Sequence, residues 1–124
     1  MRWIVDGMNV IGSRPDGWWR DRRRAMAALV DRLEQWASTE GDEVTVVFER
    51  PPSPPIDSSS ITVAHAPKAG ANSADDEIVR LVRGDAHPGE IRVATSDGAL
   101  SGRVQAAGAS VYPAERFRNL IDPP

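Results

Sequence analysis

Residues 4–9 have the sequence IVDGMN, a short apolar run that ends in an acid and a glycine. Such a run, stopped by Gly7, predicts a buried strand over residues 2–6. In an open α/β sheet, ligands bind outside the carboxyl ends of the strands. Asp6 is therefore expected at the edge of the sheet where a functional site would form. Asn9 lies close enough in sequence for its amide to point into the same crevice.

Two more acidic clusters follow predicted strands or open predicted helices. They are NSADD at residues 72–76 and ATSDG at residues 94–98. Carboxylates that converge from distant parts of a chain repel one another unless something positive joins them. The usual solution is a hard divalent cation held by oxygen ligands. A metal-dependent phosphodiesterase is therefore the first hypothesis.

Each acidic cluster also has an ordinary structural interpretation. Asp6 can bond the backbone of the next turn. Asp75 and Asp76 are expected in the first turn of a helix for which Ser73 is a good N-cap, where negative charge is favourable. Ser96 or Asp97 can cap the following helix in the same way. The recurrence of acids at equivalent places favours a site over three unrelated caps.

The remaining sequence alternates predicted strands with predicted helices. Such alternation indicates an α/β domain with a central, mainly parallel sheet of about five strands flanked by helices. We expect one domain over residues 1–124, with loops at residues 12–17, 51–55 and 70–72. The further strands are expected at residues 44–48, 61–64, 91–95 and 109–112, and the helices at residues 19–39, 73–82, 98–107 and 115–120.

Composition narrows the chemistry. The 124 residues carry a net charge of −3 and no cysteine, which excludes disulfides and thiolate metal sites. The two histidines, His65 and His87, lie beside loop signals without ligand spacing and are expected to be ordinary loop residues, so Mg²⁺ or Mn²⁺ is favoured over zinc. No apolar run approaches the roughly 20 residues that span a bilayer, and no signal peptide is recognisable. A cytoplasmic protein without a membrane partner is expected.

Basic residues gather near the start of the first long helix. A basic rim beside an acidic pocket suits an enzyme that acts on nucleic acid, although a solvated helix face is an equal alternative for any single arginine. Trp18 and Trp19 could stack unpaired bases, but packing beneath the helix is the commoner role for tryptophan, and Trp3 and Trp36 are assigned to the core. The candidate RNA-binding residues are Arg20, Arg22, Arg23, Arg24, Lys68 and Arg103.

Four motifs, in order along nearly the whole chain, resemble one known family. They are VDGMNVI at residues 5–11, VVFE at 46–49, ADDEI at 74–78 and VATSD at 93–97. Together they resemble the NYN branch of PIN-like ribonucleases, and the YacP-like proteins within it. The resemblance implies a PIN-like three-layer domain with a cluster of acids at one edge of the sheet. At residue 49, where the family commonly has Asp, this chain has Glu.

The resemblance also implies an activity and roles for residues. It implies a metal-dependent endoribonuclease that hydrolyses RNA phosphodiester bonds with Mg²⁺ or Mn²⁺. By position, Asp6, Asp76 and Asp97 would be catalytic, Asp75 would be a further metal ligand, and Asn9 and Ser96 would support the pocket. RNA is the expected partner, with structured or ribosome-associated RNA left open.

Three alternatives remain from the sequence. An RNA-binding module with a degenerate site would keep the fold without cleaving RNA, and the intact acidic set argues against it. A toxin-type nuclease with a cognate inhibitor would share the chemistry and differ only in its partner. A phosphatase or phosphotransfer domain needs a second acid or hydroxyl beside its nucleophile, and Asp6 has no second acid beside it.

Overall fold

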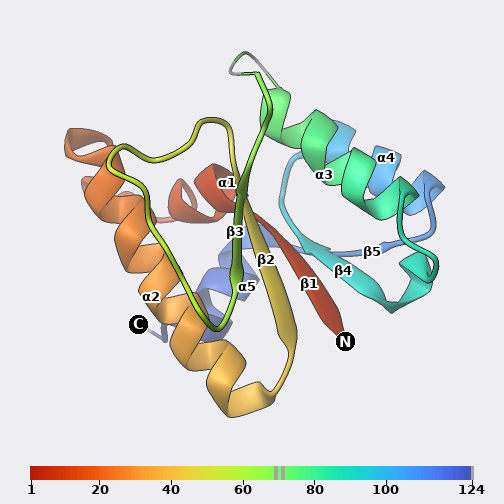
Figure 1. The fold of residues 1–124 in the computed structure, drawn as a ribbon, viewed down its shortest axis with the longest axis horizontal. Coiled ribbons are helices and arrows are strands. Elements are labelled where there is room, and N and C mark those ends of the chain that lie inside the picture. The colour runs from red at the N-terminus through yellow and green to blue at the C-terminus, as the bar shows by residue number, and fades with distance from the viewer. Residues whose placement is uncertain (69, 71, 124) are drawn as a thin grey trace.

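The fold is built around five parallel strands. The computed structural model describes residues 1–68, 70 and 72–123. The sheet has the order β3-β2-β1-β4-β5, and all four pairings are parallel (Figure 1). The elements are β1 (Arg2–Asp6), α1 (Gly7–Ile11), η1 (Trp18–Arg20), α2 (Arg22–Glu40), β2 (Glu43–Phe48), β3 (Thr62–His65), α3 (Ser73–Arg83), η2 (Pro88–Glu90), β4 (Ile91–Ala94), α4 (Gly98–Ala106), β5 (Ser110–Tyr112) and α5 (Ala114–Ile121).

Helices cover both faces of this sheet, which confirms the predicted α/β architecture. α1, α2 and α5 pack on one face, and α3 and α4 pack on the other (Figure 1). The chain runs from β1 to β2 through α1 and α2, continues into β3, and returns to β4 through α3. β1 is therefore central, and β2 and β4 lie on opposite sides of it. This reversal of strand order is the place where open α/β sheets bind ligands.

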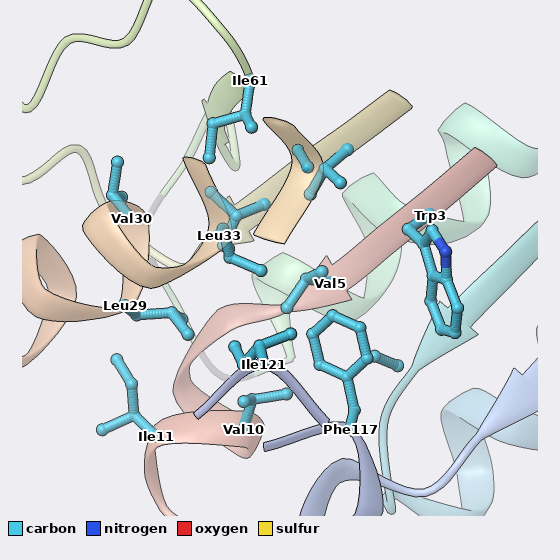
Figure 2. Close-up of a cluster of buried hydrophobic side chains, with 14 of the residues drawn as sticks. Trp3, Val5, Val10, Ile11, Leu29, Val30, Leu33, Ile61, Phe117 and Ile121 are labelled. Carbon is cyan, nitrogen blue, oxygen red and sulfur yellow. The ribbon is translucent and has the colours of Figure 1, made fainter. Parts of the chain in front are cut away.

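Successive residues of the strands point to opposite faces of the sheet and contribute to two hydrophobic cores. Val5 of β1 points toward the α1, α2 and α5 side, where it packs with Leu33, Val10 and Phe117 (Figure 2). Ile4 points to the opposite side and belongs to the cluster formed with α3 and α4. A strand covered on both faces reads as a continuous apolar run, which is why residues 2–5 and 44–48 lack the alternation of a half-exposed strand.

Three local predictions were wrong. α1 begins directly after β1 and was not expected, because Gly7 signalled a break in regular structure. Ser73 is the first residue of α3 and not its cap; Asn72 precedes the helix with a φ of 61°. His65 ends β3 rather than lying in a loop. The loop expected at residues 70–72 includes Ala71, which lies outside the described residues.

α2 is limited by signals that are clear in the sequence. The side chain of Asp21 accepts a hydrogen bond from the Arg24 backbone N–H, and Gly41, with a φ of 72°, ends the helix. Gly readily adopts such a left-handed conformation. In the part of the chain that the structure describes, no helix combines the length and the apolar character needed to cross a membrane.

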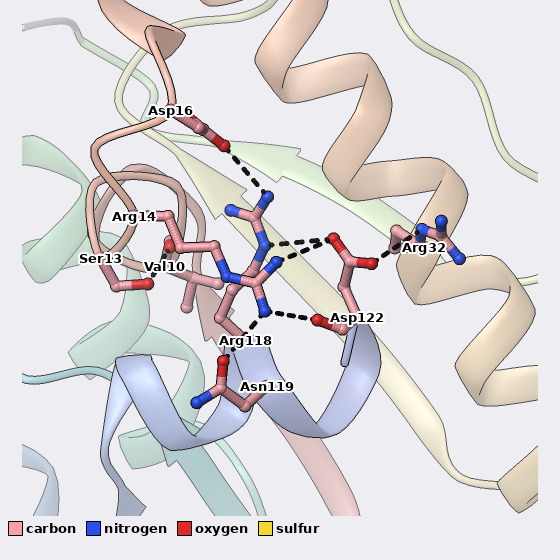
Figure 3. Close-up of polar contacts among 8 residues, drawn as sticks. All are labelled: Val10, Ser13, Arg14, Asp16, Arg32, Arg118, Asn119 and Asp122. Carbon is pink, nitrogen blue, oxygen red and sulfur yellow. Dashed lines mark hydrogen bonds and ion pairs between the residues drawn. The ribbon is translucent and has the colours of Figure 1, made fainter. Parts of the chain in front are cut away.

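Ion pairs hold α5 against the first half of the chain (Figure 3). Arg14, in the loop after α1, donates to the side chain of Asp122 at 3.2 Å and to its backbone carbonyl. Arg32 of α2 lies 3.4 Å from the same carboxylate, and Arg118 lies 3.8 Å from it. Burial lowers the pKa of Arg118 from its usual value, with Arg14 as the next contribution. The network joins α2, α5 and the loop after α1 on the side of the sheet that carries the larger core.

The connection from β2 to β3 contains no helix or strand. It includes the predicted proline-rich loop at residues 51–55 and runs along α2. Arg23 Nε donates to the carbonyl of Pro54 at 3.0 Å, and Ser58 Oγ donates to Glu34 Oε2 at 2.7 Å. The loop is thus fixed to α2 by side-chain contacts instead of by a ladder of backbone hydrogen bonds.

Candidate active site

Asp6 ends the central strand and is buried, with 6% of its surface exposed. It is paired in register with Val47 of β2, and β4 lies on the other side of β1. Thr95, which follows β4, donates from Oγ1 to Asp6 Oδ2 at 2.8 Å. A buried carboxylate needs such a partner because leaving it without one costs several kcal/mol. Asp6 therefore lies at the carboxyl edge of the sheet, between β2 and β4.

The environment of Asp6 favours its neutral form. Burial raises its pKa from 3.8 to about 6, and the hydrogen bond from Thr95 partly opposes this increase. The negative charges of Asp75, Asp97 and Glu49 raise the pKa further. We call these four acidic side chains the acidic edge; Asp6 ends β1, Asp75 lies in α3, Asp97 directly precedes α4, and Glu49 directly follows β2.

Asp97 caps a helix and also lies beside the other acids, so both positions expected for it from the sequence are found. Its side chain accepts a hydrogen bond from the Leu100 backbone N–H at 2.8 Å and so caps α4. Its own backbone N–H donates to Thr95 Oγ1 at 3.1 Å. Thr95 thereby links Asp6 to the start of α4, and the cap holds Asp97 beside the acidic edge. The capping role leaves Asp97 only partly buried.

The structure separates the two adjacent acids of α3. Asp75 is half-buried, and its pKa is raised by burial and then by Asp97, while Arg103 opposes the increase. The side chain of Asp76 is 70% exposed and pairs with Arg103, whose Nη1 lies 3.0 Å from Asp76 Oδ1. Asp75 therefore faces the acidic edge. Asp76, which the sequence predicted as catalytic, contacts Arg103 and lines a separate surface pocket with Lys68.

Asn9 and Ser96 connect the helices around the acidic edge. Asn9 Oδ1 accepts a hydrogen bond from the Ser96 backbone N–H at 2.9 Å. The Ser96 hydroxyl in turn accepts from the Ala114 backbone N–H, also at 2.9 Å, at the start of α5. These contacts hold the loop after β4 against α1 and α5. The predicted role of both residues as pocket supports remains a prediction about function.

Two residues at the site, Thr95 beside the acidic edge and Glu49 within it, had no assigned role from sequence. Thr95 is 1% exposed and bonds both Asp6 and the Asp97 backbone. Glu49 directly follows β2, beyond the residue paired with Asp6. Its position could not be inferred without knowing that β1 and β2 are neighbours. Gly7 lets the start of α1 lie against the last residue of β2, because a Cβ there would lie 2.5 Å from the Phe48 ring.

The predicted basic rim divides between different surfaces. Arg22 and Arg23 line a groove that includes Glu49, whereas Arg20 and Arg24 line a separate pocket with Trp18. Lys68 and Arg103 lie near Asp76. Trp18 packs against the core and Trp19 is 51% exposed. Only part of the arginine cluster therefore lies near the acidic edge.

The donor chemistry of the acidic edge fits a hard cation. Its side-chain donors are oxygen atoms, and the mutual repulsion that raises the pKa of Asp6 is relieved by a positive ion. Within the described residues, no group of three or more acidic or histidine side chains is arranged to hold a metal together. Mg²⁺ commonly takes one or two protein carboxylates and completes its octahedron with water and substrate oxygens. The edge fits such an open site and not a closed cage.

Replacing Thr95 by Val is expected to destabilise the protein by about 2 kcal/mol at neutral pH, because a hydrogen bond to a charged group is lost and the Asp97 N–H loses its acceptor. Loss of the Thr95 hydroxyl also raises the pKa of Asp6 further, since that bond now lowers it. Chemical denaturation measures the change in the free energy of unfolding. Thr95→Ser keeps the hydroxyl and is expected to cost less. Equal losses in both variants would contradict the role given to the hydroxyl.

Comparison with known proteins identifies the family of the chain and agrees with its fold. Residues 3–123 match the sequence model of the YacP-like NYN domain. The crystal structure of the W164L mutant of Rae1 (YacP) from Bacillus subtilis superposes with a TM-score of 0.74 at 25% identity, covering 98% of this chain and 77% of that chain. A second Rae1 (YacP) structure gives a TM-score of 0.79 at 23% identity, covering 98% and 75%. No curated protein matches the chain.

Proposed function

Because the chain belongs to the YacP-like NYN domain family, we propose that it is a metal-dependent endoribonuclease that hydrolyses RNA phosphodiester bonds at the acidic edge. NYN domains are a family of ribonucleases, so membership supports a nuclease-type function. The observation that carries the proposal is the convergence of Asp6, Asp75, Asp97 and Glu49 at the carboxyl edge of β1. Gathering like charges is unfavourable in itself, and a bound cation would relieve the repulsion among these carboxylates.

Each side chain has a part in this proposal. One or two of the carboxylates of Asp6, Asp75 and Asp97 would hold the cation directly, and the others would contact it through water molecules. A bound Mg²⁺ or Mn²⁺ supplies positive charge that polarises the phosphate and acidifies a water molecule. Thr95 orients the Asp6 carboxylate through its hydrogen bond. One of the carboxylates accepts a proton from the attacking water.

The test is cleavage of end-labelled single-stranded and structured RNAs by the purified protein. We expect cleavage with Mn²⁺ or Mg²⁺ and none with chelator. Loss of activity in Asp97→Asn, with the fold checked by circular dichroism, would link activity to the acidic edge. Absence of cleavage with every metal, together with RNA binding that Asp97→Asn leaves unchanged, would favour the RNA-binding module instead.

The two adjacent acids of α3 provide a matched pair of variants. Asp75→Asn is expected to reduce the cleavage rate by on the order of 10²-fold, because it removes a carboxylate from the site. Asp76→Asn is expected to leave the rate close to that of the wild type, since an exposed ion pair with Arg103 contributes little. Single-turnover rates at saturating metal measure both. A larger loss in Asp76→Asn would return Asp76 to the catalytic role predicted from sequence.

A further inference from the structure

A groove of about 450 Å³ lies beside the acidic edge, between the start of α2 and the segment that follows β2. This volume falls within the range of roughly 300–1,000 Å³ that is usual for ligand pockets. The lining combines apolar side chains with arginines. The apolar part includes Met8, Met26 and Phe48, and the basic part comprises Arg22, Arg23 and Arg50.

The arginines give the groove a strongly positive rim. Arg23 is fixed by its bond to the Pro54 carbonyl, and the Arg22 guanidinium lies 5.3 Å from the Trp18 ring centroid. Arg50 is exposed and has no ion-pair or hydrogen-bond partner among the described residues. Among the described residues that line the groove, Glu49 is the one acid, and it also belongs to the acidic edge. Guanidinium groups bind phosphate oxygens well because their donors match the oxygen geometry.

The groove lies next to the acidic edge because residues that line it directly follow Asp6 and its strand partner Val47 in the sequence. Met8 lies in the first turn of α1, directly after Asp6 and Gly7. Phe48 and Glu49 follow Val47, the partner of Asp6 in the β1–β2 register. A polymer whose phosphate reaches Asp6 therefore has its next unit beside the groove. The apolar side chains of the groove suit the base of a nucleotide, and the arginines at its rim suit the phosphate.

We propose that this groove binds one nucleotide of single-stranded RNA next to the scissile phosphate. The base lies against Met8 and Met26, and Arg22 and Arg50 bind the adjoining phosphate. The base must be unpaired to reach the groove, which makes single strands and loops the substrate class. Methionine side chains adapt to different shapes, so little preference among bases is expected. This assignment rests on the proposed function, since it places the groove beside its reaction site.

The methionines provide a direct probe. The chain has three, so methyl-¹³C-methionine labelling gives one signal each for Met1, Met8 and Met26. Titration with adenosine 5′-monophosphate and with a short single-stranded RNA, in chelator, is expected to shift the Met8 and Met26 signals. Met1 is exposed at the opposite end of β1 and is expected to stay unchanged. Inorganic phosphate and adenosine, titrated separately, are expected to give weaker shifts than the nucleotide.

A pair of arginine variants completes the test. Arg50→Ala is expected to weaken nucleotide binding about tenfold, because a charged hydrogen bond to phosphate is lost. Arg83→Ala, at the far end of α3, removes the same charge away from the groove and is expected to leave binding unchanged. Equal shifts at all three methionines, or shifts with phosphate that match those with the nucleotide, would overturn the assignment.

The result separates the groove from the nuclease activity. Groove binding without cleavage at any metal concentration would support the nucleotide site and reject the proposed reaction. Cleavage without shifts at Met8 and Met26 would support the reaction and reject the groove as the neighbouring subsite. The labelled protein without metal reports binding alone, so neither outcome depends on the other measurement.

Discussion

Replacing Asp6 by Asn is expected to abolish RNA cleavage and, at the same time, to stabilise the metal-free protein at neutral pH. The cleavage rate should fall by at least about 10²-fold, because the variant loses the central carboxylate of the acidic edge. The free energy of unfolding should rise by about 3 kcal/mol, because the raised pKa of Asp6 means that its buried charge opposes folding. The Thr95 hydroxyl can still donate to the amide oxygen of Asn.

The raised pKa of Asp6 also determines how the stability difference between Asp6→Asn and the wild type changes with pH. Since the pKa of Asp6 is raised from 3.8 to about 6, its stabilising contribution is complete below pH 4 and is lost as the pH rises through 6. The difference between Asp6→Asn and the wild type should therefore be near zero at pH 3.5 and reach its full size above pH 7. The charges of Asp75, Asp97 and Glu49, which face Asp6, act in the same direction.

Denaturant titrations in chelator across this pH range measure the difference. Asp57→Asn, at an exposed position in the loop between β2 and β3, is the matched control and should change neither stability nor cleavage. A variant at Asp6 that is less stable than the wild type at pH 7 would show that the carboxylate is needed for the fold. The acidic edge would then be a structural feature and not a site maintained at a cost in stability.

Replacing Phe117 by Ala is expected to lower the free energy of unfolding by about 3–5 kcal/mol, the usual cost of removing a buried phenylalanine. Its ring is fully buried on α5 and lies beside Trp3 (Figure 2). Its ring centroid is 5.0 Å from that of Trp3 and 5.5 Å from that of Trp36. Loss of the ring removes both aromatic contacts and leaves a cavity between α5 and β1.

Leu120→Ala, on the same helix but 44% exposed, separates loss of the aromatic cluster from a general effect on α5. It should cost much less than Phe117→Ala in the same denaturation experiment. Equal losses would indicate that helix propensity, and not core packing, holds α5 in place. Because Ser96 bonds the first residue of α5, we also expect Phe117→Ala to loosen the loop after β4.

The sheet was predictable because its strands are short apolar runs separated by clear turn residues. α1 was not predictable, because five residues that begin with Gly are too few to show a helical period. Their conformation depends on contact with Phe48 and with the side of the sheet that α2 covers. The predicted N-cap of α3 was also wrong. Whether Asn72 or Ser73 precedes the helix depends on a backbone angle that residue type does not determine.

The orientation of Asp75 and Asp76 in α3 could have been predicted from helical spacing, but that spacing was not applied to them. Asp75 shares a helical face with Val79 and Val82, which are buried. Asp76 shares a face with Arg80 and Arg83, which are exposed. Helical spacing alone therefore points Asp75 toward the sheet. The part played by Glu49 could not be found this way, because it depends on which strand lies beside β1.

The hydrogen bond between Thr95 and Asp6 joins residues that are 89 positions apart in the chain. A chain still under synthesis presents Asp6 long before β4 exists to pair with β1. Until that pairing forms, the carboxylates stay apart and nothing can gather a cation among them. If the protein cleaves RNA as proposed, an incomplete chain is harmless to its own message, and the activity begins only when the last third of the sequence has folded onto the first strand.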